Sequence, residues 1–107
     1  YQAKFDDYPR VGSIVGYSMI KAIAAGLTKA KSTKAEDLIE AFRGVEFDTP
    51  FGTAMFRAQD QQSTLGAFVG RTTVVDGQGT MKDFSYMDGA DFQPSDEEVM
   101  KRRGSAK

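Results

Sequence analysis

Few side chains in this sequence could carry out catalysis. Its 107 residues include no histidine and no cysteine, so the most common general base, the most common zinc ligand and any thiol nucleophile are absent. A nucleophile would have to be a hydroxyl, a lysine or a carboxylate, and no serine lies in a nucleophile-elbow pattern or beside an evident base. We therefore expect no enzymatic activity, no metal site and no cofactor.

Two groups of neighbouring acidic residues could bind a cation. Asp6 and Asp7 are adjacent near the start of the chain, and Asp96, Glu97 and Glu98 form a run near its end. A solvated loop accounts for the first pair, and acidic residues often begin a helix because they complement the positive end of its dipole. We interpret both groups as structural.

The glycine-rich stretches do not form a nucleotide-binding motif. Gly77 and Gly79 join two strand-like segments, without the lysine and the following helix of a phosphate-binding loop. No strand leads into Gly12, Gly16 or Gly26 at the spacing that a dinucleotide-binding fingerprint requires. We predict a hairpin turn at the first pair and close helix packing at Gly16 and Gly26.

Aromatic residues are numerous enough to form a recognition surface. The chain has eight phenylalanines and four tyrosines but no tryptophan. Their spacing is typical of a core, and we predict that Phe42, Phe47 and Phe68 are buried. Tyr17 lies near the start of a predicted helix, where its hydroxyl either finds a partner within the protein or contacts a ligand. Both interpretations of Tyr17 stay open.

Composition limits the partners of the chain. Fourteen basic and fifteen acidic residues give a net charge of −1, which offers no positive field for nucleic acid or an anionic membrane. A chain of this length forms one domain at most, with little core to spare. Because Tyr1 is not the product of a start codon, we expect the chain to be part of a longer or processed protein.

A long apolar helix is predicted in the first third of the chain. Residues 14–27 are apolar or small except for a narrow polar stripe that includes Ser18 and Lys21, so this helix should be buried on most of its circumference. Ser13 is a suitable N-cap. At 14 residues, with a lysine in its middle, the run is too short to cross a membrane.

Two shorter helices are marked by their ends. Thr33 and Glu36 form a capping-box pattern before an amphipathic helix over residues 35–43, and Gly44 provides the left-handed position that commonly ends a helix. Ser95 precedes a final short helix with an acidic start and a basic end, which suits the helix dipole.

The hydrophobic period changes from helical to two after residue 44. Residues 45–48 and 53–57 predict a hairpin around a Thr-Pro-Phe-Gly turn. Residues 64–75 and 80–86 predict a second hairpin around Asp76-Gly77, with a bulge or bend at its glycines. The chain is therefore predicted to have an α/β fold, with two N-terminal helices, then β-hairpins and a short C-terminal helix.

These signals, in this order, resemble the C-terminal part of the solute-binding proteins of the branched-chain amino acid (leucine/isoleucine/valine-binding) type of ABC importer. The resemblance covers residues 12–95, and its strength lies in the shared order and spacing of short motifs. The motifs are Gly-Tyr-Ser-Met-Ile-Lys-Ala-Ile-Ala-Ala-Gly at 16–26, Phe-Asp-Thr-Pro-Phe-Gly at 47–52, Arg-Ala-Gln-Asp-Gln-Gln at 57–62, Gly-Ala-Phe-Val-Gly at 66–70 and Asp76-Gly77.

The resemblance implies a partial lobe of a type I periplasmic binding protein. Such a receptor is exported to the periplasm, closes on a small ligand and delivers it to the membrane permease of an ABC importer. Residues 1–67 would belong to the N-terminal lobe, residues 68–75 to a hinge crossing, and residues 76–107 to the edge of the C-terminal lobe and the tail. The last three of these residues lie outside the part described below.

The resemblance also implies where function resides. The loop entering the first helix, residues 11–13, reaches the ligand cleft in this family, which points to Gly12 and Ser13 as ligand-binding residues. Tyr17, one turn into the helix, joins them as a candidate because of its ring and hydroxyl. Gly12 and Ser13 stand where the family often has a bulky side chain. The hinge would comprise Phe68, Val69, Gly70, Arg71 and Thr72.

Two functions remain after sequence analysis. The first is the solute-binding component of an ABC importer for branched-chain amino acids or a related small organic anion. The alternative is an independent small α/β protein-interaction domain whose exposed strands pair with a partner. In either case the unpaired strands predict that the chain associates with itself.

Overall fold

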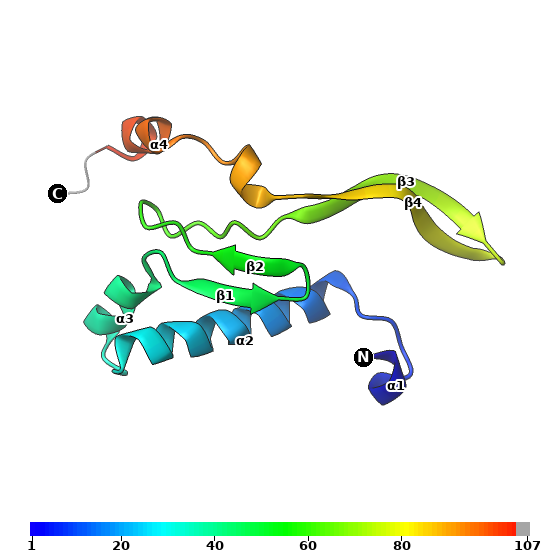
Figure 1. Ribbon diagram of the computed structural model, residues 1–107, viewed down its shortest axis with the longest axis horizontal. Coiled ribbons are helices and arrows are strands. Elements are labelled where there is room, and N and C mark those ends of the chain that lie inside the picture. The colour runs from blue at the N-terminus through cyan, green and yellow to red at the C-terminus, as the bar shows by residue number, and fades with distance from the viewer. Residues whose placement is uncertain (105–107) are drawn as a thin grey trace. The chain divides into compact units, whose positions relative to one another are not determined.

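A computed structural model describes residues 1–104 (Figure 1). It confirms the predicted mixture of helices and small antiparallel sheets. The chain divides into two compact units, with the boundary between Ser63 and Thr64. The elements are α1 (Gln2–Phe5), α2 (Val11–Ala30), α3 (Ala35–Phe42), β1 (Glu46–Thr49), β2 (Gly52–Met55), β3 (Ala67–Val75), β4 (Gln78–Met87), a 3-10 turn (Gly89–Phe92) and α4 (Asp96–Arg103).

Helix α2 is longer than its hydrophobic pattern predicts. It begins at Val11, so Ser13 is its third residue and not its N-cap, and the Ser13 Oγ accepts a hydrogen bond from the Arg10 backbone N–H at 3.4 Å. The prediction that the run is too short to cross a membrane was wrong. By length and composition alone, the 20-residue helix is long and apolar enough to do so, a test that core helices and signal sequences also pass.

The buried side of α2 consists of small residues. Ser18, Ala22 and Gly26 follow one another at intervals of four and are each buried, and the Ser18 hydroxyl donates to the Ile14 carbonyl at 2.8 Å. The prediction of burial around most of the helix was therefore wrong, as was the assignment of Ser18 to a solvent-facing stripe. The large apolar side chains of α2 that are exposed are Val11, Val15, Tyr17, Met19, Ile20, Ile23 and Leu27.

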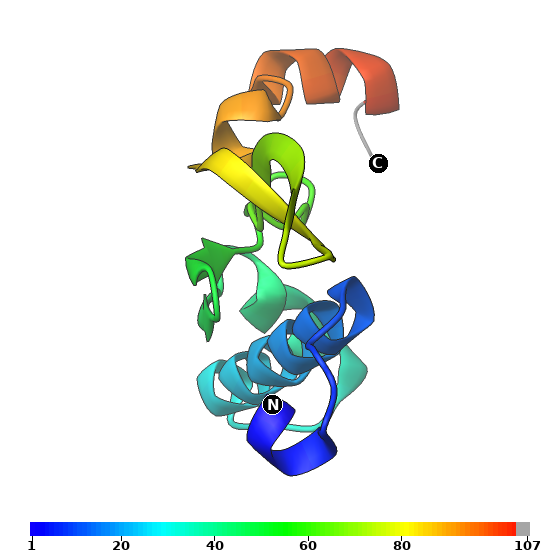
Figure 2. The ribbon, with the colours of Figure 1, turned by 90° about the vertical axis from the view of Figure 1, so that its right-hand side faces the viewer.

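Small residues let α2 approach its neighbours closely. Helix α2 packs against both β1 and α3, as Figures 1 and 2 show. A Cβ added at Gly26 would lie 2.6 Å from the Cζ of Phe42, so this position admits the ring only because it is glycine. The prediction of close helix packing is therefore confirmed at Gly26. It was wrong for Gly16, where a Cβ would meet nothing within 4 Å.

The predicted helix ends are partly confirmed. The capping box of Thr33 and Glu36 does not form, because α3 begins one residue later, after Lys34. Gly44 has the predicted left-handed conformation, with a φ of 65°. At α4, the Ser95 Oγ accepts a hydrogen bond from the Glu98 backbone N–H at 3.2 Å, as its sequence predicts.

Strands β1 and β2 form the first predicted hairpin and carry the small core of the first unit. They pair antiparallel, with Phe47 opposite Ala54 and Thr49 opposite Gly52. Val45, Phe47 and Ala54 are buried, together with Ala22 and Ala41 of the helices. The burial of Phe47 confirms its predicted core position, whereas Phe42 is only half-buried.

Strands β3 and β4 form the second predicted hairpin. Its turn at Asp76 and Gly77 has φ values of 49° and 76°, as expected for a two-residue hairpin turn. The ladder shifts register between Val69 and Arg71, so a bulge is present, but its extra residue lies in β4, where Asp83 and Phe84 stand opposite Gly70. The prediction that Phe68 is buried was wrong, because it is 42% exposed. In a two-stranded sheet, it packs across the strands on the rings of Phe84 and Tyr86.

Candidate ligand-binding site

The three predicted ligand-binding residues lie on the first two turns of α2. The prediction that Gly12 and Ser13 belong to a loop before the helix was wrong, because both are helical. Ser13 and Tyr17 are four residues apart and so lie on one face of the helix, and the Tyr17 side chain is exposed. Nothing lies within 4 Å of the position that a Cβ would take at Gly12.

These residues offer a limited set of contacts. The Ser13 hydroxyl accepts a hydrogen bond from Arg10 and keeps its proton for donation to a ligand. Tyr17 presents an apolar ring and a phenolic hydroxyl. An exposed ion pair lies beside them, in which the Arg10 Nη2 is 3.5 Å from the Asp7 Oδ2. This end of α2 can form one side of a binding site.

The five predicted hinge residues, 68 to 72, lie together in β3. All five are exposed, and the bulge of β4 at Asp83 and Phe84 lies opposite Gly70. Arg71 stands directly opposite Lys82 on β4, which places two positive charges side by side. Because a β-bulge bends the strand that carries it and increases the local twist, the hairpin twists more strongly beside this segment.

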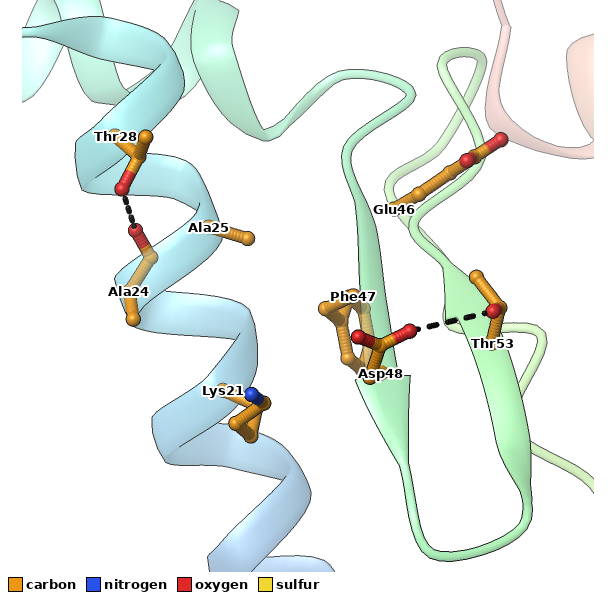
Figure 3. A pocket seen from close by; sticks show the side chains of 8 residues that line it. All are labelled: Lys21, Ala24, Ala25, Thr28, Glu46, Phe47, Asp48 and Thr53. Carbon is orange, nitrogen blue, oxygen red and sulfur yellow. Dashed lines mark hydrogen bonds between the residues drawn. The ribbon is translucent and has the colours of Figure 1, made fainter.

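A cavity between α2 and the β1–β2 hairpin was not predicted from the sequence. It has a volume of about 380 Å³, and Figure 3 shows the side chains that line it. They are Lys21, Ala24, Ala25 and Thr28 of α2, and Glu46, Phe47, Asp48 and Thr53 of the hairpin.

The walls of this cavity differ in charge. Lys21 of α2 is half-buried, and carboxylates lie on the strand side. The Asp48 carboxylate accepts a hydrogen bond from the Thr53 hydroxyl at 3.4 Å, whereas Thr28 donates to the Ala24 carbonyl of its own helix. The sequence shows that Glu46 and Asp48 alternate with buried residues. It does not show that these two carboxylates line the same cavity as Lys21, which depends on how α2 packs.

A buried ion pair organises the loop after β2. The Arg57 side chain is 15% exposed and that of Asp60 is 3% exposed. The guanidinium donates through Nε to Oδ1, at 3.1 Å, and through Nη2 to Oδ2, and the same Oδ1 accepts the Gln62 backbone N–H at 3.0 Å. The six-residue motif at 57–62 therefore shapes a loop.

The solved structures that align with this chain include two proteins from Rhodopseudomonas palustris. An ABC-type branched-chain amino acid transporter aligns with a TM-score of 0.75 and 30% identity, over 83% of this chain and 24% of the other. An ABC transporter protein aligns with a TM-score of 0.57 and 36% identity, over 67% of this chain and 22% of the other. The chain matches part of a branched-chain amino acid ABC transporter protein. The resemblance seen in the sequence is confirmed.

This chain is much shorter than the solved proteins with which it aligns. Most of this chain aligns, yet it spans about a quarter of the length of each solved neighbour. The described fold is therefore that of part of a lobe, as predicted. No protein-family model and no curated protein matches the chain.

Proposed function

We propose that this chain is part of the solute-binding component of an ABC importer, which carries branched-chain amino acids or a related small organic anion. The observation that carries this proposal is the alignment of 83% of the chain, at 30% identity, with an ABC-type branched-chain amino acid transporter. The partners of the whole receptor would be its small ligand and a membrane permease, and its location would be the periplasm.

The ligand would meet this chain at the start of α2. Gly12 would allow close approach to the backbone of the first turn, Ser13 would donate a hydroxyl hydrogen bond and Tyr17 would supply ring surface. The charged groups beside these residues, Asp7 and Arg10, are paired with each other, so the other lobe would provide the main groups for the amino and carboxylate ends of an amino acid. Residues 68–72 would serve as the hinge on which the lobes close.

Isothermal titration calorimetry tests this proposal. We expect the longer receptor that contains this sequence to bind leucine, isoleucine, valine or a small organic anion at micromolar concentration. The 107-residue chain alone should bind none of them more tightly than millimolar, because hydrogen bonds contribute about 0.5 to 1.5 kcal/mol each. Micromolar binding by the isolated chain, or no binding by the longer receptor, would overturn the proposal.

One observation favours the alternative of an independent protein-interaction domain. The large apolar residues of α2 are exposed, and Ile20 reaches 61%. Exposed apolar patches of this kind mark interaction sites. The partial alignment explains the same surface more simply, because the solved neighbours are far longer and so contain further elements that could cover it.

A further inference from the structure

The outer edge of β1 carries backbone groups that no other strand in residues 1–104 pairs with. The Val45 carbonyl accepts a hydrogen bond from the Phe56 N–H at 3.0 Å, so the backbone carbonyl of residue 45 points toward β2. Because the direction of the backbone N–H and C=O groups alternates from residue to residue along an antiparallel pair, those of Phe47 and Thr49 also point toward β2. The N–H and C=O groups of Glu46 and Asp48 therefore point away from the hairpin.

A groove follows this edge. The cavity of about 380 Å³ described above adjoins a second of about 440 Å³, and both are lined by Ala25, Thr28 and Glu46. Figure 3 shows α2 on the side of β1 away from β2, so the helix forms the second wall. We call this depression, lined by α2 residues 21–29 and hairpin residues 44–48 and 53, the β1 groove.

We propose that the β1 groove binds an extended, basic segment of a partner protein as an additional strand. A strand added to an exposed edge gains main-chain hydrogen bonds, and it requires only about 4.7 to 4.9 Å of lateral space. Ala24 and Ala25 keep the helix wall low, which leaves room for small apolar side chains on that side of the incoming segment.

Charge determines the other side of the segment. The Glu46 and Asp48 side chains are exposed, two residues apart on the face opposite Phe47, and neither forms an ion pair with any of the first 104 residues. Side chains directly opposite one another in a sheet attract when their charges differ and repel when they are alike. The residues facing Glu46 and Asp48 should therefore be lysine or arginine.

The same argument disfavours a second copy as the occupant. Antiparallel pairing of β1 with its own copy would place like charges opposite one another: Glu46 would face Asp48 of the copy in a 46-to-48 register, and Asp48 would face Asp48 in a 48-to-48 register. Lys21 and Lys29 both lie on the helix wall, and the Lys29 Nζ donates to the Arg43 carbonyl at 2.7 Å. Both would face the apolar side of the segment, away from its basic side chains. The fitting partner alternates basic with small apolar residues.

Fluorescence anisotropy with a labelled, blocked peptide of three Lys-Val repeats tests this inference, using the 107-residue chain. We expect it to bind at least tenfold more tightly than a Glu-Val peptide of equal length, and to shift the amide resonances of Glu46 and Asp48. Glu46→Lys with Asp48→Lys should reverse the preference. The control pair Glu36→Lys with Asp91→Lys makes the same change in net charge at exposed residues outside the groove and should leave the preference unchanged.

Backbone pairing is tested separately from charge. Asp48→Pro and Asp48→Ala both remove the carboxylate, but only proline also removes the outward N–H of β1, and neither removes a bond to β2. Asp48→Pro should therefore bind the Lys-Val peptide at least tenfold more weakly than Asp48→Ala, with circular dichroism as the folding check. Equal binding of the two peptides, unshifted Glu46 and Asp48 amides, or a reversed preference in the control pair would overturn the inference. So would self-association through β1 without peptide binding. Failure of the solute-binding proposal leaves every one of these readouts unchanged.

Discussion

Removal of the Asp60 carboxylate should destabilise the chain far more than loss of a surface charge. Asp60 accepts two hydrogen bonds from Arg57 and one from the Gln62 backbone, and its side chain is almost fully buried. Breaking a buried pair by removing one partner costs about 3 to 5 kcal/mol. Because Arg57 is 15% exposed and keeps some contact with water, we expect Asp60→Ala to cost about 3 kcal/mol.

Urea denaturation followed by circular dichroism measures this cost. With a slope of about 1.5 kcal/mol per molar urea, the midpoint should fall by about 2 M. The exposed pair Glu40 and Arg43 has the same i,i+3 spacing, so Glu40→Ala is a matched control that should cost less than about 0.5 kcal/mol. A cost for Asp60→Ala below about 1 kcal/mol, or equal costs for the two variants, would refute the reasoning from burial.

Three further outcomes are expected. In the longer receptor, Ser13→Ala should weaken solute binding by no more than about 1.5 kcal/mol, roughly tenfold by calorimetry, and a larger loss would give Ser13 a different role. Light scattering should show self-association of the isolated chain at tens of micromolar, because α2 and the hairpin β3–β4 expose apolar side chains, and a monomer there would contradict it. Gly77→Ala should raise the free energy of the folded state by about 1 kcal/mol in urea titrations, because φ is 76° at this position; no change would argue against the turn.

Local chemistry in the sequence determined the turns and several ends of elements. Asp76 and Gly77 adopt the left-handed conformations of a tight hairpin turn, and Gly44 does the same after α3. Ser95 caps α4 through its hydroxyl. These features depend on residues within a few positions of one another, so no information about distant parts of the chain is needed to predict them.

The family resemblance was also contained in the sequence. The motifs of α2, of the Thr-Pro-Phe-Gly turn and of the second hairpin occur in a fixed order, and the structural alignment with the transporter protein bears out what that order indicates. Order and spacing survive when individual residues change, because they reflect the sequence of elements and their connections. The resemblance still does not specify which side chain of α2 contacts a ligand.

Burial was decided only by tertiary structure. The apolar pattern of α2 shows that one side of the helix must be buried, but it does not show which side. The buried side is that of Ser18, Ala22 and Gly26, because these small residues let β1 and α3 approach the helix closely. Phe68 lies in an apolar stretch typical of a buried strand, yet it is exposed, because within residues 1–104 β4 is the only strand that pairs with β3. The β1 groove arises in the same way. Lys21 and Asp48 are far apart in the sequence, yet they line one cavity because α2 packs along the outer edge of β1. Local sequence patterns do not specify this contact between distant segments.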